Sequence, residues 1–136
     1  MIVIDCSAAM GMVRKTPEGN ALSDLALDGE TAIAPDVFYA ELGNALWECV
    51  RSGDLGRSQI REAMEAAIGL VDRIYSSKDI LAEAILEAAR LDHPVYDMLY
   101  FVLARREGAT LFTLDRKLQN LCLDNGVNCV FLDKDF

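Results

Sequence analysis

The sequence contains a single histidine, His93, and none of its four cysteines pairs with another as C-x-x-C. All four cysteines have apolar neighbours, so we expect reduced thiols packed in the core of a cytoplasmic protein. One histidine and no cysteine pair are too few nitrogen and sulfur ligands for zinc. We therefore predict no zinc site.

Long apolar runs are also missing, and those present are far too short to cross a bilayer. The opening "MIVIDCSAAM" has no basic segment before its apolar residues and reaches Asp5 at once, so we expect no signal peptide. With 136 residues, 52% hydrophobic and 26% charged, and no linker or repeat, the chain is predicted to fold as one domain, residues 1–136.

Positive charge is scarce, because 13 lysines and arginines face 22 acidic residues and the net charge is −9. A protein that bound nucleic acid mainly through phosphates would be basic. Three explanations stay open: the protein binds no polyanion, its acids group around cations, or a basic partner accompanies it. Acidity alone is weak evidence, because surface acids also serve solubility.

Short apolar runs alternate with amphipathic segments along the chain. We predict strands at 1–5, 31–34, 108–115 and 127–132, and helices at 7–15, 16–27, 36–53, 57–74, 78–91, 94–106 and 116–126. This order indicates an α/β fold with a central parallel sheet, right-handed crossovers and helices on both faces. The helices at 57–74 and 78–91 are predicted to form a hairpin that serves core packing alone.

Four of the acidic residues occupy positions where the pattern calls for apolar groups. Asp5 closes the first strand, and Asp115 ends the apolar run "TLFTL". Glu41 shares a helical face with Val37 and Phe38. Asp97 shares a stripe with three residues that face a core, namely Tyr100, Phe101 and Ala104. The other helical acids lie on polar faces and are interpreted as solvated surface charges.

These four acids are predicted to converge, because parallel strands end at one edge and the helices from Pro35 and Pro94 can cover that edge. Like charges so close would repel, and we expect no buried lysine or histidine beside them. A divalent cation would compensate, and oxygen-only ligands favour Mg²⁺ or Mn²⁺ over zinc or copper. The sequence thus predicts a cation site at this edge.

Each member of the set also has a simpler interpretation. Asp115 could cap the helix that begins at Arg116, and Asp5 could be a turn residue at a strand end. Ser7, Asn44 and Thr113 surround the acids and could orient them or contact phosphate, although Ser7 and Thr113 equally fit ordinary capping and turn chemistry. Ser7 is the predicted cap of the first helix, and His93 is interpreted as a structural or helix-start residue.

Four pieces of the sequence carry a family resemblance: "IVIDCSA", "PDVFYAELGNAL", "YDMLYFVLARREGATLFTLDRKL" and the closing "VF". In this order and spacing they resemble the PIN-domain ribonucleases, and within them the VapC-type toxins of type II toxin–antitoxin pairs. The resemblance spans essentially the whole chain. Its most specific piece is the stretch that holds Asp97 and Asp115.

The resemblance implies a three-layer α/β/α PIN-like fold and a Mg²⁺- or Mn²⁺-dependent endoribonuclease. It implies that Asp5, Glu41, Asp97 and Asp115 are the catalytic, metal-binding acids and that Ser7 and Thr113 support them. RNA would be the substrate and a cognate antitoxin the partner, and we expect a homodimer with residues 57–91 as an interface. Some relatives carry a further acid where this chain has Gln119, so the number of metals stays open.

Three other functions remain as alternatives, and each makes its own demand on the sequence. A stand-alone PIN-like nuclease would need no antitoxin. A Mg²⁺-dependent phosphatase or phosphotransfer domain would call for Asp-x-Asp after the first strand, where this chain has "DCS". A non-catalytic binding module would not need to keep all four acids. Five basic residues near the specific motifs could guide RNA or could be solvated helix ends, namely Arg90, Arg105, Arg106, Arg116 and Lys117.

Overall fold

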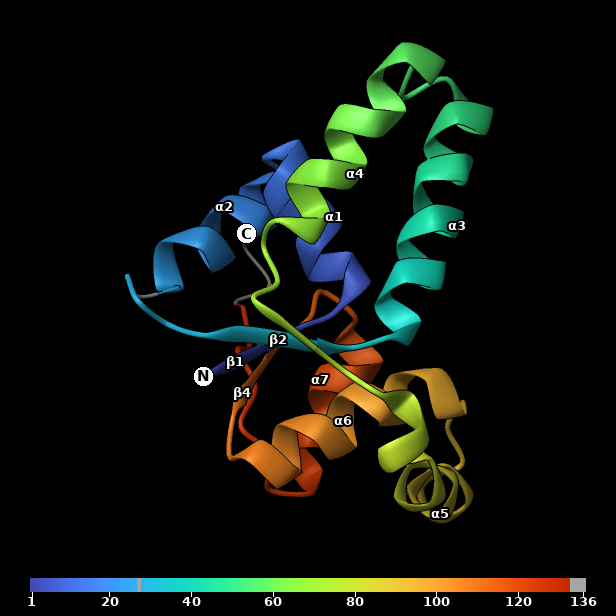
Figure 1. Cartoon of the computed structure of the whole chain (residues 1–136). Coiled ribbons are helices and arrows are strands. Elements are labelled where there is room, and N and C mark those ends of the chain that lie inside the picture. Colours follow the sequence, from blue (N-terminus) through green and yellow to red (C-terminus); the bar gives the residue numbers. More distant parts are fainter. Residues whose placement is uncertain (27, 133–136) are drawn as a thin grey trace.

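A parallel sheet forms the centre of the molecule in the computed structural model, which describes residues 1–26 and 28–132 (Figure 1). Within these residues the sheet has four strands in the order β3-β2-β1-β4. Their bounds are β1 Ile2–Ile4, β2 Ala32–Pro35, β3 Arg73–Tyr75 and β4 Thr110–Phe112. Ile2 of β1 is in register with Ala32 of β2 and Thr110 of β4. The predicted parallel sheet is confirmed.

Helices cover both faces of this sheet (Figure 1). One layer holds α1 (Cys6–Arg14), α2 (Pro17–Leu25), α3 (Val37–Ser52) and α4 (Ile60–Ile68), and the other holds α5 (Leu81–Leu91), α6 (Val95–Glu107) and α7 (Arg116–Asp124). Short 3₁₀ turns, Arg57–Gln59 and Ser77–Asp79, precede α4 and α5. All of β1 is buried because both faces are covered. The three-layer α/β/α architecture is therefore confirmed.

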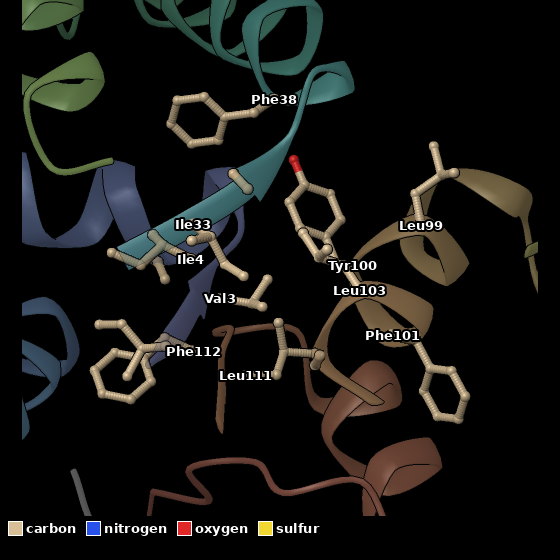
Figure 2. Close-up of a cluster of buried hydrophobic side chains, with 14 of the residues drawn as sticks. Val3, Ile4, Ile33, Phe38, Leu99, Tyr100, Phe101, Leu103, Leu111 and Phe112 are labelled. Atoms are coloured by element: carbon tan, nitrogen blue, oxygen red, sulfur yellow. The ribbon is translucent and has the colours of Figure 1, made fainter. Parts of the chain in front are cut away.

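Helix α6 packs into the centre of the core rather than along its edge. Figure 2 shows its apolar side chains meeting those of β1, β2 and β4. Seven consecutive residues, Met98 to Ala104, are buried, whereas the sequence predicted a single buried stripe. A helix that is apolar on all sides is a buried helix. Its polar residues lie at its two ends, with Asp97 in the first turn and the exposed Arg105 and Arg106 in the last.

The predicted helix at 57–74 is confirmed only in its central part, Ile60–Ile68. Helix α4 ends at Ile68, and Arg73–Tyr75 form strand β3 at the edge of the sheet. The regular spacing of Ile68, Val71 and Ile74 imitates a continuing helix. The Asp72 carboxylate accepts a 2.8 Å hydrogen bond from the Ala32 amide and helps to hold β3 beside β2.

The predicted hairpin of two helices is wrong for the same reason. Because β3 intervenes, α4 packs on α3 and α1, whereas α5 packs on α6 in the other layer (Figure 1). The predicted last strand, 127–132, is reduced to one isolated bridge between Leu111 and Cys129. The predicted helix 16–27 ends at Leu25, and its position 27 lies outside the described residues. No helix in the described ranges is long and apolar enough to span a membrane.

Candidate active site

Asp5 lies where β1 passes into α1, at the carboxyl end of the sheet. It caps α1, because its Oδ1 accepts a 2.9 Å hydrogen bond from the Ala8 amide. The predicted cap, Ser7, is therefore wrong. The Ser7 hydroxyl instead donates a 2.7 Å hydrogen bond to Asp5 Oδ1, and the Thr113 hydroxyl donates to Asp5 Oδ2. Both oxygens of this carboxylate are thus fixed in place.

The same hydroxyl groups join the ends of β1 and β4. Ser7 Oγ accepts a 3.0 Å hydrogen bond from the Leu114 amide and lies 3.3 Å from Thr113 Oγ1. Thr113 Oγ1 also accepts from the Asp115 amide at 3.1 Å. Ser7 and Thr113 therefore do more than ordinary capping, because together they tie the Asp5 carboxylate to the strand that leads to Asp115.

Burial raises the pKa of Asp5 from its ordinary 3.8 to about 6, and the nearby negative charge of Asp97 adds to this rise. The hydrogen bonds from Thr113, Ala8 and Ser7 oppose it. An ionised carboxylate that is 6% exposed and has no positive partner among the described residues is unfavourable. Asp5 is therefore a group whose charge calls for compensation by a cation.

Glu41 lies one turn into α3 and faces the same edge. Its Oε1 accepts a 2.6 Å hydrogen bond from the hydroxyl of Tyr100 on α6, a contact that the sequence analysis missed. Figure 2 shows the Tyr100 hydroxyl oxygen at the rim of the apolar cluster. Partial burial raises the pKa of Glu41, the Tyr100 hydrogen bond lowers it, and the charge of Asp97 raises it.

Asp97 is half-buried in the first turn of α6, with 27% of its side chain exposed. Its Oδ2 lies 2.6 Å from Nε2 of His93, whose side chain is only 3% exposed. The expectation that no buried histidine stands beside these acids is therefore wrong. His93 lies four residues before Asp97 but outside α6, in the segment before Pro94, so helical spacing gave no signal of this contact.

Asp115 is placed differently from the other three acids. Its Oδ1 accepts hydrogen bonds from the amides of Lys117 and Leu118, at 2.9 and 3.4 Å, so it caps α7 as the simpler interpretation proposed. Asp115 is connected to Asp5 through Thr113, whose hydroxyl accepts a hydrogen bond from the Asp115 amide and donates one to Asp5 Oδ2.

The structure thus brings Asp5, Glu41 and Asp97 within electrostatic reach of one another, with Asp115 nearby through the hydroxyl network. Apart from the bonds to Asp97 Oδ2 and Glu41 Oε1, these two carboxylates accept no hydrogen bond from the residues that the structure describes, so each keeps an oxygen available. Among the described residues, no three Asp, Glu, His or Cys side chains lie in an arrangement that could already hold a metal ion. The chemistry of the donors, all oxygen and mutually repelling, fits a hard divalent cation, and binding would require the carboxylates to draw closer.

A cleft of about 1070 Å³ opens beside these acids, between α1 and α3. Of the predicted site residues, Ser7, Glu41 and Asn44 line it, and Tyr96 of α6 stands at its side. Cys6 also lines the cleft, but burial and the charges of Glu41 and Asp5 raise its pKa to about 12. A thiol with that pKa is not a nucleophile at neutral pH.

Most of the basic residues considered as RNA guides are already paired. Arg105 and Arg106 lie 2.6 and 2.7 Å from the Glu83 carboxylate, and Arg90 lies 2.5 Å from Glu87. These ion pairs hold α6 to α5 and fix the end of α5. The cleft is lined instead by Arg14 and Arg51, which the sequence analysis did not single out.

A family model described as the PIN domain matches residues 2–123. This match covers most of the chain, and the parallel sheet with its acids at the carboxyl edge agrees with it. The chain belongs to the PIN-domain family.

Curated relatives and a solved structure extend the comparison. The chain is 26% identical over 121 residues to Ribonuclease VapC3 of Pyrobaculum aerophilum, covering 86% of this chain and 91% of that protein. It is 36% identical over 87 residues to Ribonuclease VapC1 of Mycobacterium tuberculosis, covering 62% and 63%. The fold matches VapBC2 of Rickettsia felis, solved with a DNA fragment from their promoter, with a TM-score of 0.67, 17% identity and coverage of 98% and 100%. The resemblance to VapC-type proteins is confirmed.

Proposed function

We propose that this protein is a Mg²⁺- or Mn²⁺-dependent endoribonuclease and the toxin of a toxin–antitoxin pair. The observation that carries the proposal is that Asp5 and Glu41 both lie close enough to Asp97 for its negative charge to act on them, at the carboxyl edge of a PIN-domain sheet. The names of its relatives, Ribonuclease VapC3 and Ribonuclease VapC1, support RNA as the substrate. No observation favours a phosphatase over this activity.

Asp5, Glu41 and Asp97 would hold the cation, with Asp115 as the fourth acid of the site. A bound divalent cation supplies Lewis acidity, which lowers the pKa of water and offsets charge on phosphoryl oxygens. Thr113 and Ser7 orient the Asp5 carboxylate, and the Tyr100 hydroxyl orients that of Glu41. Asn44, exposed in the cleft one turn after Glu41, is placed to contact the RNA.

Hydrolysis would break the bond between phosphorus and the 3′-oxygen of the RNA. A water molecule adds its oxygen to phosphorus, so the products are a 5′-phosphate and a 3′-hydroxyl. The protein needs no nucleophile of its own for this step, which agrees with the high pKa of Cys6. Its acids must be ionised to hold the cation, so at limiting Mg²⁺ activity should fall as the pH drops below about 6, where protons compete with the cation for Asp5.

The decisive experiment measures RNA cleavage with Mg²⁺ or Mn²⁺, with chelator, and with Asp97→Asn. Asparagine can still accept the hydrogen bond from His93, so the fold should persist while cleavage falls at least a hundredfold. Asp124→Asn at the exposed end of α7 is the matched control and should cleave like the wild type. Cleavage that persists in chelator or in Asp97→Asn would exclude the proposed site.

An antitoxin partner is part of the proposal because the whole chain matches the fold of VapBC2. Exposed apolar surface supports a protein partner, since Trp47 and Tyr39 are 56% and 48% exposed beside a groove of about 570 Å³ between α3 and α4. If a small reading frame lies immediately upstream of the gene, co-expression with its product should abolish cleavage and yield a complex. RNA cleavage that is undiminished after co-expression would favour a stand-alone nuclease.

A homodimer is proposed on the strength of α5, which exposes Leu81, Ile85 and Leu86. Leu86 is 70% exposed, and Ile85 beside it is 50% exposed, so α5 presents adjacent apolar side chains on its surface. Light scattering should give twice the 15.0 kDa chain mass for the wild type and the monomer mass for Leu86→Lys. An unchanged mass in the variant would exclude α5 as the interface.

A further inference from the structure

His93 is the only histidine in the chain, and its environment is unusual. The side chain is 3% exposed, and its Nε2 lies 2.6 Å from Asp97 Oδ2. Its other ring nitrogen, Nδ1, is buried without a hydrogen-bond partner among the described residues. Buried polar atoms are nearly always satisfied, so this arrangement requires an explanation.

The geometry assigns the ring proton to Nε2. An ionised carboxylate can only accept a hydrogen bond, so the nitrogen facing Asp97 must donate. A second proton on Nδ1 would be a buried donor with no acceptor, which costs more than a buried lone pair. The imidazole therefore acts as a rigid Nε2–H donor whose orientation depends on its contact with Asp97.

This donor can control only one oxygen of the carboxylate. His93 engages Oδ2, and no group in the described part of the chain donates to Oδ1. The 27% exposure of the Asp97 side chain leaves that second oxygen accessible. An imidazole that hydrogen-bonds one oxygen of a metal-ligating carboxylate fixes the direction of the other.

We propose that His93 is a positioning residue for the cation site, holding Asp97 so that its Oδ1 is presented to the ion. The inference rests on the proposed function, because it requires Asp97 to bind a cation. His93 itself does not reach the substrate, since its ring is enclosed. A purely local role, in which the pair only stabilises the start of α6, predicts no effect on cation affinity.

The first test compares Mn²⁺ affinity, by calorimetry at fixed pH, between the wild type, His93→Leu and His93→Gln. Leucine removes the donor while filling the space, and glutamine offers a donor near the position of Nε2. Removing a group that orients a ligand weakens metal binding about ten- to a hundredfold. We expect such a loss in His93→Leu and recovery in His93→Gln to within about threefold of the wild type.

Val127→Ala is the matched control, because Val127 is buried just after the end of α7 and its amide donates to the Cys122 carbonyl rather than to a residue of the site. It should lose stability without losing Mn²⁺ affinity. His93→Leu that binds Mn²⁺ as tightly as the wild type would overturn the positioning role, even if that variant is less stable.

A second test needs no variant at position 93. In untagged protein, all imidazole resonances belong to His93, so nitrogen-15 spectra report its tautomer directly. We expect a proton on Nε2, and a shift of these resonances when Mg²⁺ saturates the wild type, with no shift in Asp97→Asn. Resonances that stay unmoved while calorimetry shows Mg²⁺ binding would overturn the inference.

The two proposals fail in different ways. A wild-type protein that binds neither ion and cleaves no RNA overturns the proposed function, and the role of His93 with it. A wild-type protein that binds Mn²⁺ and cleaves RNA, with His93→Leu indistinguishable from it in affinity, overturns only the role of His93.

Discussion

The hydroxyl of Tyr100 donates a 2.6 Å hydrogen bond to Glu41 Oε1, joining the buried helix α6 to the helix that borders the cleft. The ring of Tyr100 packs in the core, where the residue is 1% exposed, whereas its hydroxyl oxygen contacts Glu41 of the candidate site. Burial, together with the charge of Glu41, raises the pKa of Tyr100 well above its usual range, so this hydroxyl remains a donor at every physiological pH.

Tyr100→Phe should therefore separate packing from site chemistry. The ring keeps its place, but Glu41 loses the hydrogen bond that lowers its pKa, so that pKa rises further. We expect unfolding to become easier by about 1 kcal/mol. The acidic limb of the pH–rate profile should move to higher pH, because Glu41 then ionises later. An unmoved limb would show that Glu41 does not need to be ionised.

The raised pKa of Asp5 predicts how the stability of the metal-free protein depends on pH. A folded-state pKa of about 6 against an ordinary 3.8 means that the folded protein holds a proton that the unfolded chain has released. This stabilisation is fully present below about pH 4 and is lost as the pH rises through 6. It amounts to roughly 3 kcal/mol. Urea unfolding in chelator should show the free energy of unfolding falling between pH 4 and pH 8.

Asp5→Asn should be more stable than the wild type at pH 8, by about 1–3 kcal/mol, and should cleave no RNA. Asparagine keeps a polar group for Ser7, Ala8 and Thr113 but removes the buried charge. Saturating Mg²⁺ should stabilise the wild type at pH 8 and leave the variant unchanged. A variant less stable than the wild type at pH 8 would mean that Asp5 is not destabilised by its charge.

The acids of the site could be predicted because strand ends are visible in the sequence. Asp5 and Asp115 follow short apolar runs that predict strands. Because parallel strands end at the same edge of a sheet, residues that follow them lie at that edge. Glu41 and Asp97 were marked by apolar neighbours at helical spacing. These features are local, and they placed all four acids on elements that reach the same edge.

Contacts between distant elements were not visible in the sequence. Arg105 forms an ion pair with Glu83, which is more than twenty positions away in the sequence. The residues around Arg105 in the sequence therefore do not distinguish an arginine in an ion pair from one that contacts RNA. The burial of His93 depends on how the turn before α6 packs, so a lone histidine before a proline resembled a helix start. Strand β3 has only three residues, with Arg73 exposed, and gave no alternating pattern.

Gln119 bears on the number of cations. Its amide is buried, at 1% exposure, and donates a 2.7 Å hydrogen bond to the Thr113 carbonyl. A carboxylate there would lose this bond and face the carbonyl oxygen, so Gln119→Glu should destabilise the protein by about 1–3 kcal/mol or more. We expect no additional Mn²⁺ in calorimetric titrations of this variant. A second bound Mn²⁺ would show that position 119 can reach the site.

Asp115 has two functions to separate, because its carboxylate caps α7 and also belongs to the proposed site. Asparagine caps helices about as well as aspartate, whereas alanine does not. Asp115→Asn should therefore keep its stability within a few tenths of a kcal/mol, and Asp115→Ala should lose about 1 kcal/mol in urea unfolding. If Asp115 takes part in cleavage, both variants lose activity with Mg²⁺ despite their different stabilities. Full cleavage by Asp115→Asn would limit this residue to capping and leave Asp5, Glu41 and Asp97 as the acids of the site.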